Sequence, residues 1–104
     1  MTIAMYPRLI LPDDFDERAR DEARQKGYIS GALIELEKGK FYKAYFISPT
    51  RLRQDLETEV TLGRPYIAEP GLVVVPEISI ESIEAILGQL VSDGFFENLK
   101  PLEG

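Results

Sequence analysis

The stretch from residue 29 to residue 47 constrains the fold most, because it predicts a β-hairpin. Two runs rich in β-branched and aromatic residues, 29–37 and 40–47, flank a turn in which Gly39 suits a positive φ angle. Alternate side chains of the two runs then share one face and predict part of a core. These side chains are Ala32, Ile34, Leu36, Tyr42, Ala44 and Phe46. A chain with this hairpin is expected to contain a β-sheet.

The opposite face of the hairpin carries aromatic side chains that need cover. Lys43 points outward there between Phe41 and Tyr45, so a helix, another chain or a ligand must cover the apolar surface beside it. Core packing is the commoner role for aromatic residues in a hairpin, and contact with a partner protein is the alternative. We therefore take Phe41 and Tyr45 as candidate partner-binding residues.

Helices are expected before and after the hairpin. Asp14 and Glu17 match a capping box that begins the first helix, and Gly27 ends it. Ser79 caps the last helix, whose apolar face is regular and which ends at Gly94. That face is formed by Ile83, Ile86, Leu87, Leu90 and Val91.

The helix that follows the hairpin has equally clear signals. Ser48 is a good N-cap and Pro49 suits the first helical position. Leu52, Leu56 and Val60 recur every four residues and predict a buried apolar stripe.

Short strands at residues 6–11 and 72–75 complete the order β-α-β-β-α-β-α. The unbroken apolar run at 72–75 predicts a strand buried on both faces. We predict a single α+β domain over residues 1–104, built as a two-layer sandwich. The first six elements have the order of a split βαβ unit, which allows a ferredoxin-like topology with an extra C-terminal helix. A sheet with a different strand order is the alternative.

Cysteine and histidine are both absent, and this excludes several functions. The chain can form no disulfide, no thiolate nucleophile and no zinc site of the usual nitrogen or sulfur kind. It also has no imidazole to act as a base near neutral pH. We therefore expect a protein without enzymatic activity, without a metal and without a cofactor.

The net charge of −6 is unevenly distributed, because residues 66–104 hold seven acidic side chains and only one basic one. Such a surface repels phosphate backbones and argues against nucleic acid as a partner, whereas a basic protein is compatible with it. No apolar run approaches the ~20 residues of a membrane span, and the N-terminus has no secretory signal pattern. We expect a cytoplasmic protein with no membrane contact.

Three acids surround the start of the last helix: Glu77, Glu81 and Glu84. We take them as candidate partner-binding residues. A divalent metal is the alternative, but the helix dipole already explains acids in a first turn, and no calcium-binding loop accompanies them.

Two places in the sequence are candidates for binding an anion. Arg51 follows Ser48 in the first turn of its helix, where backbone N–H groups favour anions. The alternative is a solvated face on which Arg51 pairs with Asp55 and Arg53 pairs with Glu57.

The second place is the irregular stretch "LGRPYIAEPG" at residues 62–71, where Arg64, Tyr66 and Glu69 present a cation, a hydroxyl and a carboxylate. Its prolines also suit a plain crossover. A helix of 13 residues spans about 20 Å, which separates Arg51 from Arg64 and argues against one shared site in a single chain.

The leading hypothesis is a non-enzymatic protein-interaction module that binds itself or another protein. It rests on the missing histidine and cysteine, the uneven charge and the aromatic surface of the hairpin. The alternative is a domain that binds a small anionic metabolite through Arg51, Arg64, Tyr66 and Glu69. An enzyme that uses Tyr66 and Glu69 as acid and base has no support in the sequence.

Overall fold

The predicted hairpin is the centre of the computed structural model, which describes residues 6–102. Strand β2 (Tyr28–Glu37) and strand β3 (Lys40–Ile47) pair antiparallel, and Gly39 in the turn has a φ of 81°. Ala32 lies opposite Ala44, and Ile34 lies opposite Tyr42. Five of the six predicted core residues of the hairpin are buried and Leu36 packs partly buried against them, so the predicted core face is confirmed.

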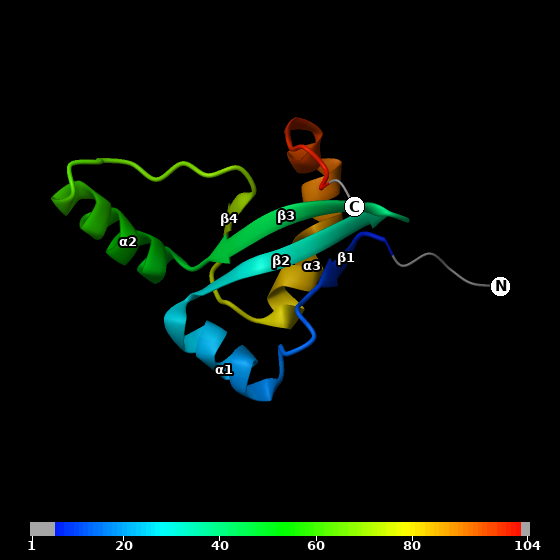
Figure 1. Ribbon diagram of the computed structural model, residues 1–104, viewed down its shortest axis with the longest axis horizontal. Coiled ribbons are helices and arrows are strands. Elements are labelled where there is room, and N and C mark those ends of the chain that lie inside the picture. The colour runs from blue at the N-terminus through cyan, green and yellow to red at the C-terminus, as the bar shows by residue number, and fades with distance from the viewer. Residues whose placement is uncertain (1–5, 103–104) are drawn as a thin grey trace.

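Two short strands extend the hairpin into a four-stranded mixed sheet (Figure 1). Strand β1 (Arg8–Ile10) pairs antiparallel with β2, and strand β4 (Leu72–Val74) pairs parallel with β3, so the order is β1-β2-β3-β4. The α+β class is confirmed. In a split βαβ unit another strand separates the two strands that a helix connects. Here β3 and β4 are direct neighbours, so the ferredoxin-like order is not the one observed.

Three α-helices and one short 3₁₀-helix accompany the sheet: α1 (Glu17–Lys26), α2 (Pro49–Thr61), α3 (Ile80–Ser92) and η1 (Phe95–Asn98). The N-cap of α1 is Asp16, whose carboxylate accepts a hydrogen bond from Ala19 N–H at 2.9 Å. The prediction that Asp14 caps this helix is wrong. A turn closed by Phe15 N–H and the Pro12 carbonyl occupies those residues and delays the helix.

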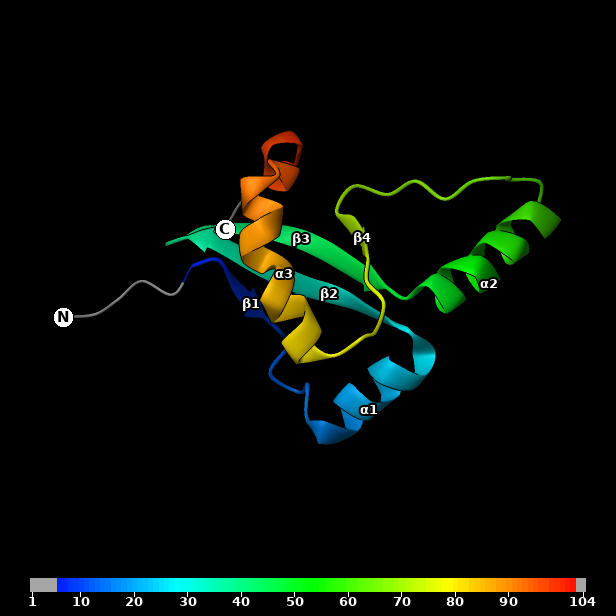
Figure 2. The ribbon, with the colours of Figure 1, turned by 180° about the vertical axis from the view of Figure 1, so that it is seen from behind.

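The core lies between the sheet and α3, which crosses one face (Figure 2). Ile83 and Leu87 of α3 are buried there against the apolar face of the hairpin. After α3 the chain folds back, and the Phe96 ring packs on the Tyr42 ring with 5.3 Å between centroids. The opposite face of the sheet is turned to the viewer in Figure 1, and within residues 6–102 no helix covers it.

Helix α2 stands away from the sheet (Figures 1 and 2). None of its side chains is buried, and Leu56 and Val60 are 37% and 54% exposed. The predicted burial of its apolar stripe is therefore wrong. The helix continues outward from the end of β3, and the segment that runs back beside it has no regular structure. The core face of the sheet therefore does not cover the apolar stripe of α2.

The burial of strand β4 also differs from the prediction. Val73 and Val75 are buried, but Val74 is 47% exposed. The expected burial on both faces is wrong because β4 is an edge strand and only the α3 side of the sheet is covered in the part of the chain that the structure describes.

Candidate functional site

A cavity of about 620 Å³ lies between α2, the segment that returns from it and the edge of the sheet. We call residues 62–71 the return segment, and α2 with the return segment the arm. The cavity forms because the return segment doubles back beside α2 before the chain enters β4. Gly71 makes the entry possible, because its φ is 82° and a Cβ at this position would lie 2.6 Å from the Lys43 carbonyl oxygen. Its carbonyl accepts a hydrogen bond from Tyr45 N–H at 2.9 Å.

All four residues proposed for ligand binding line this cavity: Arg51, Arg64, Tyr66 and Glu69. The length of the helix between Arg51 and Arg64 predicts that they are too far apart for one site. Both arginines line the same cavity, Arg51 from the start of α2 and Arg64 from just after its end. The 13-residue helix expected between them is nevertheless observed and separates them by about 20 Å along its axis.

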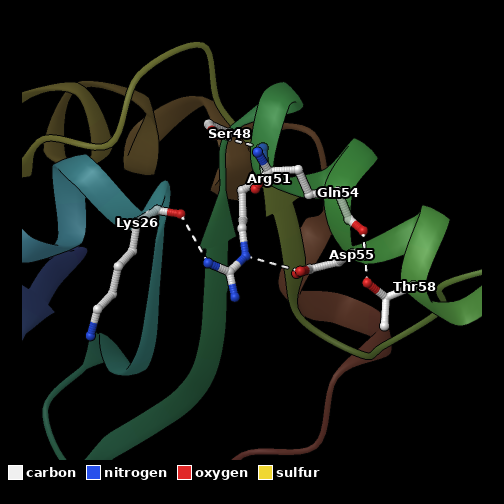
Figure 3. A network of polar contacts seen from close by, with 6 residues as sticks. All are labelled: Lys26, Ser48, Arg51, Gln54, Asp55 and Thr58. Carbon is white, nitrogen blue, oxygen red and sulfur yellow. Dashed lines mark hydrogen bonds and ion pairs between the residues drawn. The ribbon is translucent and has the colours of Figure 1, made fainter.

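The guanidinium of Arg51 makes three contacts near the junction of α1 and α2, and Figure 3 shows the two hydrogen bonds among them. Its Nε donates to Asp55 at 2.9 Å, and its Nη1 donates to the Lys26 carbonyl at 3.3 Å. Its guanidinium also lies over the Tyr28 ring, 4.5 Å from the centroid, a favourable cation–π arrangement. Arg51 therefore fastens the base of the arm to the end of α1.

Arg64 closes the far end of the arm. Its Nε lies 2.8 Å from a Glu59 carboxylate oxygen, and its backbone N–H donates to the Glu59 carbonyl at 2.8 Å. Each arginine of the cavity thus has its own carboxylate partner. Because Glu69 adds a third carboxylate, the lining carries one negative charge in excess, which opposes the binding of an anion.

Tyr45 forms the floor of the cavity on β3. Burial raises the pKa of its hydroxyl, and the carboxylates of Asp55 and Glu69 raise this pKa further, with only partial compensation from Arg51. Its ring stacks on that of Tyr28 at 5.9 Å between centroids. A phenol with a raised pKa stays protonated near neutral pH and is a hydrogen-bond donor, not a base.

The five candidate partner-binding residues lie on several elements. Tyr45 lies in the cavity, whereas Phe41 lies at the hairpin end of β3, where its carbonyl accepts a hydrogen bond from Leu102 N–H. Glu77 lies 3.9 Å from Arg24 of α1, Glu81 lines a second cavity of about 320 Å³ beside α1, and Glu84 is exposed on α3. Glu77 and Glu81 both lie near Arg24, whereas Phe41 and Tyr45 lie on β3.

The exposure of the apolar side chains of the arm and of β4 was not predicted from the sequence. Seven large apolar side chains are exposed within residues 6–102, and five of them lie between residues 56 and 74. They are Leu56, Val60, Leu62, Tyr66 and Val74. The i, i+4, i+8 stripe of α2 was the available signal, but a stripe indicates only that a face needs cover, not what covers it.

Comparison with known proteins finds no family model that matches the chain, no similar curated protein and no matching solved structure. No helix within residues 6–102 has both the length and the apolar character that crossing a membrane requires. Over the same residues, no group of three acidic side chains is arranged to hold a metal ion.

Proposed function

We propose that this protein is an interaction module that binds a partner protein through the arm. The observation that carries the proposal is a helix of 13 residues with no buried side chain, next to a concentration of exposed apolar groups. Isolated helices of this length are marginally stable in water, and most helices in proteins are stabilised by packing of an apolar face. A partner that covers Leu56 and Val60 would supply that packing.

The way in which the arm is attached supports this role. The start of α2 is fastened by Arg51 to α1 and to the Tyr28 ring of β2, and the turn after its end is closed by the Arg64–Glu59 ion pair. The middle of the helix presents Leu56 and Val60 to solvent. A fixed helix loses less conformational freedom when it binds than a free segment does, which favours association.

The proposal is tested by photo-crosslinking. A photoreactive amino acid in place of Val60 is expected to form a covalent adduct with a protein, and the same amino acid in place of Glu84, which is exposed on α3, is the control. Leu56→Glu should reduce the Val60 adduct, because it places a charge in the proposed contact. If position 60 forms no more adduct than position 84, the arm is not a docking element.

A second candidate function is the binding of a small anionic metabolite in the cavity. The observation in its favour is that Arg51, Arg64, Tyr66 and Glu69 line one space of about 620 Å³. An anion would have to compete with Asp55 for Arg51 and with Glu59 for Arg64. Binding is therefore expected to be weak unless one of these carboxylates is removed.

Thermal unfolding with a panel of phosphates and carboxylic acids tests this candidate. Asp55→Asn, which frees Arg51, should increase the stabilisation by the anion that binds, and Glu84→Gln is the matched control with the same change in charge. A ligand at ~100 times its dissociation constant adds ~2.7 kcal/mol to the free energy of unfolding. If no member of the panel stabilises Asp55→Asn, the cavity is not an anion site.

A further inference from the structure

The order of charges along α2 is the reverse of what a helix prefers. Arg51 and Arg53 lie near its start, its first turn holds no acid, and its last turn holds no base. A helix dipole favours acids at the start and bases at the end, and α1 follows that rule with Glu17 and Lys26. The basic start and acidic end of α2 need a different explanation.

The charged residues of α2 divide between two flanks of its apolar stripe. Residues four apart differ by only about 40° around a helix, so Arg53 and Glu57 share one flank. Asp55 and Glu59 lie on the other flank, which faces the cavity, and they already bind Arg51 and Arg64. Arg53 and Glu57 are both exposed, and among the described residues neither forms an ion pair. The expected Arg53–Glu57 pair within the helix is thus not observed.

We propose that the partner of the arm is a second copy of this chain, paired through antiparallel α2 helices about a two-fold axis. The proposal rests on the proposed function of the arm. A two-fold axis perpendicular to both helices places each flank against the same flank of the other copy, with the direction reversed. Arg53 then faces the partner's Glu57, and Glu57 faces the partner's Arg53. Leu56, at the middle of the stripe, lies next to the axis.

We call the flank with Arg53 and Glu57 the free flank. Its charge favours a second copy over a strongly charged partner. With one cation and one anion, the flank is neutral, so it does not select a basic or an acidic protein. The antiparallel copy satisfies both charges at once. The acids Glu77, Glu81 and Glu84, which would attract a basic protein, lie outside the arm.

The size of the arm predicts the strength of the dimer. A helix of 13 residues is about 20 Å long, and one such helix with part of the return segment covers less than the ~800 Å² per partner of a standard interface. We therefore expect a weak dimer that dissociates on dilution.

Analytical ultracentrifugation of the purified chain over a wide range of concentrations tests the proposal. The wild type should form a concentration-dependent dimer, and Leu56→Glu should be monomeric throughout. Arg53→Glu replaces the two attractive Arg53–Glu57 contacts between the copies with two repulsive ones. It should raise the dissociation constant of the dimer about tenfold. The double variant Arg53→Glu/Glu57→Arg reverses the flank and should restore the dimer, because antiparallel complementarity survives the exchange.

Circular dichroism establishes that each variant is folded, and Glu84→Arg on α3 is the control for a change in charge outside the arm. A wild type that stays monomeric at every concentration overturns the dimer. If the wild type is monomeric but the photoreactive amino acid at position 60 crosslinks to a different protein, the identity of the proposed partner is wrong and the docking function of the arm stands. A dimer that persists in Leu56→Glu, or a double variant as weak as Arg53→Glu, also overturns the antiparallel pairing.

Discussion

At the scale of single residues, Glu35 is the buried acid of the described chain, with 5% of its surface exposed. Its carboxylate accepts hydrogen bonds from Arg8 Nε at 2.6 Å and from Gly39 N–H at 3.2 Å. It therefore ties the edge strand β1 and the hairpin turn to β2. Burial by itself raises the pKa of Glu35, but the hydrogen bonds from Arg8 and Gly39 and the positive charge of Arg8 together outweigh it, so this pKa lies below its usual value.

The lowered pKa predicts how Glu35 contributes to stability as a function of pH. A carboxyl group whose pKa is lower in the folded state stabilises the fold above its unfolded pKa and loses this contribution as the pH falls through the folded pKa. Glu35→Gln should therefore lower the unfolding temperature near neutral pH and differ less from the wild type in acid. Thermal unfolding from neutral pH into acid measures this, with Glu37→Gln, an exposed neighbour, as the control. An equal difference at all pH values would contradict the role of the charge.

At the scale of elements, α2 and α3 have the same length and similar end signals but different surroundings. Each spans 13 residues and begins with a serine N-cap, Ser48 in α2 and Ser79 in α3. The apolar face of α3 lies on the sheet, whereas the stripe of α2 faces solvent. Their contributions to the stability of the monomer should therefore differ.

A pair of truncations measures this difference. Ile83→Ala removes a side chain with 0% exposure and should cost about 2–5 kcal/mol of unfolding free energy. Leu56→Ala removes a side chain that is 37% exposed and should cost less than about 1 kcal/mol in dilute protein. Urea denaturation of both variants at low concentration gives the comparison. Equal losses would mean that α2 is packed in solution.

The entry into β4 depends on Gly71. Its φ is 82°, and a Cβ at this position would lie 2.6 Å from the Lys43 carbonyl oxygen. Gly71→Ala should therefore destabilise the fold by more than about 1 kcal/mol. Gly63→Ala is the matched control, because Gly63 has a φ of 88° but no atom within 4 Å of that position. If chemical denaturation gives the two variants the same loss, the close approach of the backbone contributes nothing.

At the scale of the whole molecule, the exposed apolar side chains of the arm predict whether the folded chain associates with a partner. Most of the exposed large apolar side chains lie on one segment at one end of the sheet. A native state that associates is stabilised by mass action, so its unfolding temperature rises with protein concentration. We expect the unfolding temperature of the wild type to rise with concentration and that of Leu56→Glu to stay constant. Differential scanning calorimetry measures both, and a constant value for the wild type would contradict association.

The features that local chemistry decides were predictable from the sequence. The turn at Gly39, the caps at Ser48 and Ser79, and the helix end at Gly94 were all expected and are all observed. Each depends on residues within a few positions of one another. The N-cap of α1 shows where local chemistry is insufficient. Asp14 and Asp16 have the same side chain, and the turn at Pro12 decides which of them caps the helix.

The sequence by itself determined the elements, their order and the residues that need cover. The tertiary structure alone decided the strand order, the exposed edge at Val74, the cavity that Arg51 and Arg64 both line, and the separation of α2 from the core. The physical reason is that an apolar stripe or a charged side chain indicates only which kind of surroundings it needs. Contacts between segments that are distant in the sequence decide which part of the molecule supplies those surroundings. For Leu56 and Val60, the fold of a single copy leaves that requirement unmet.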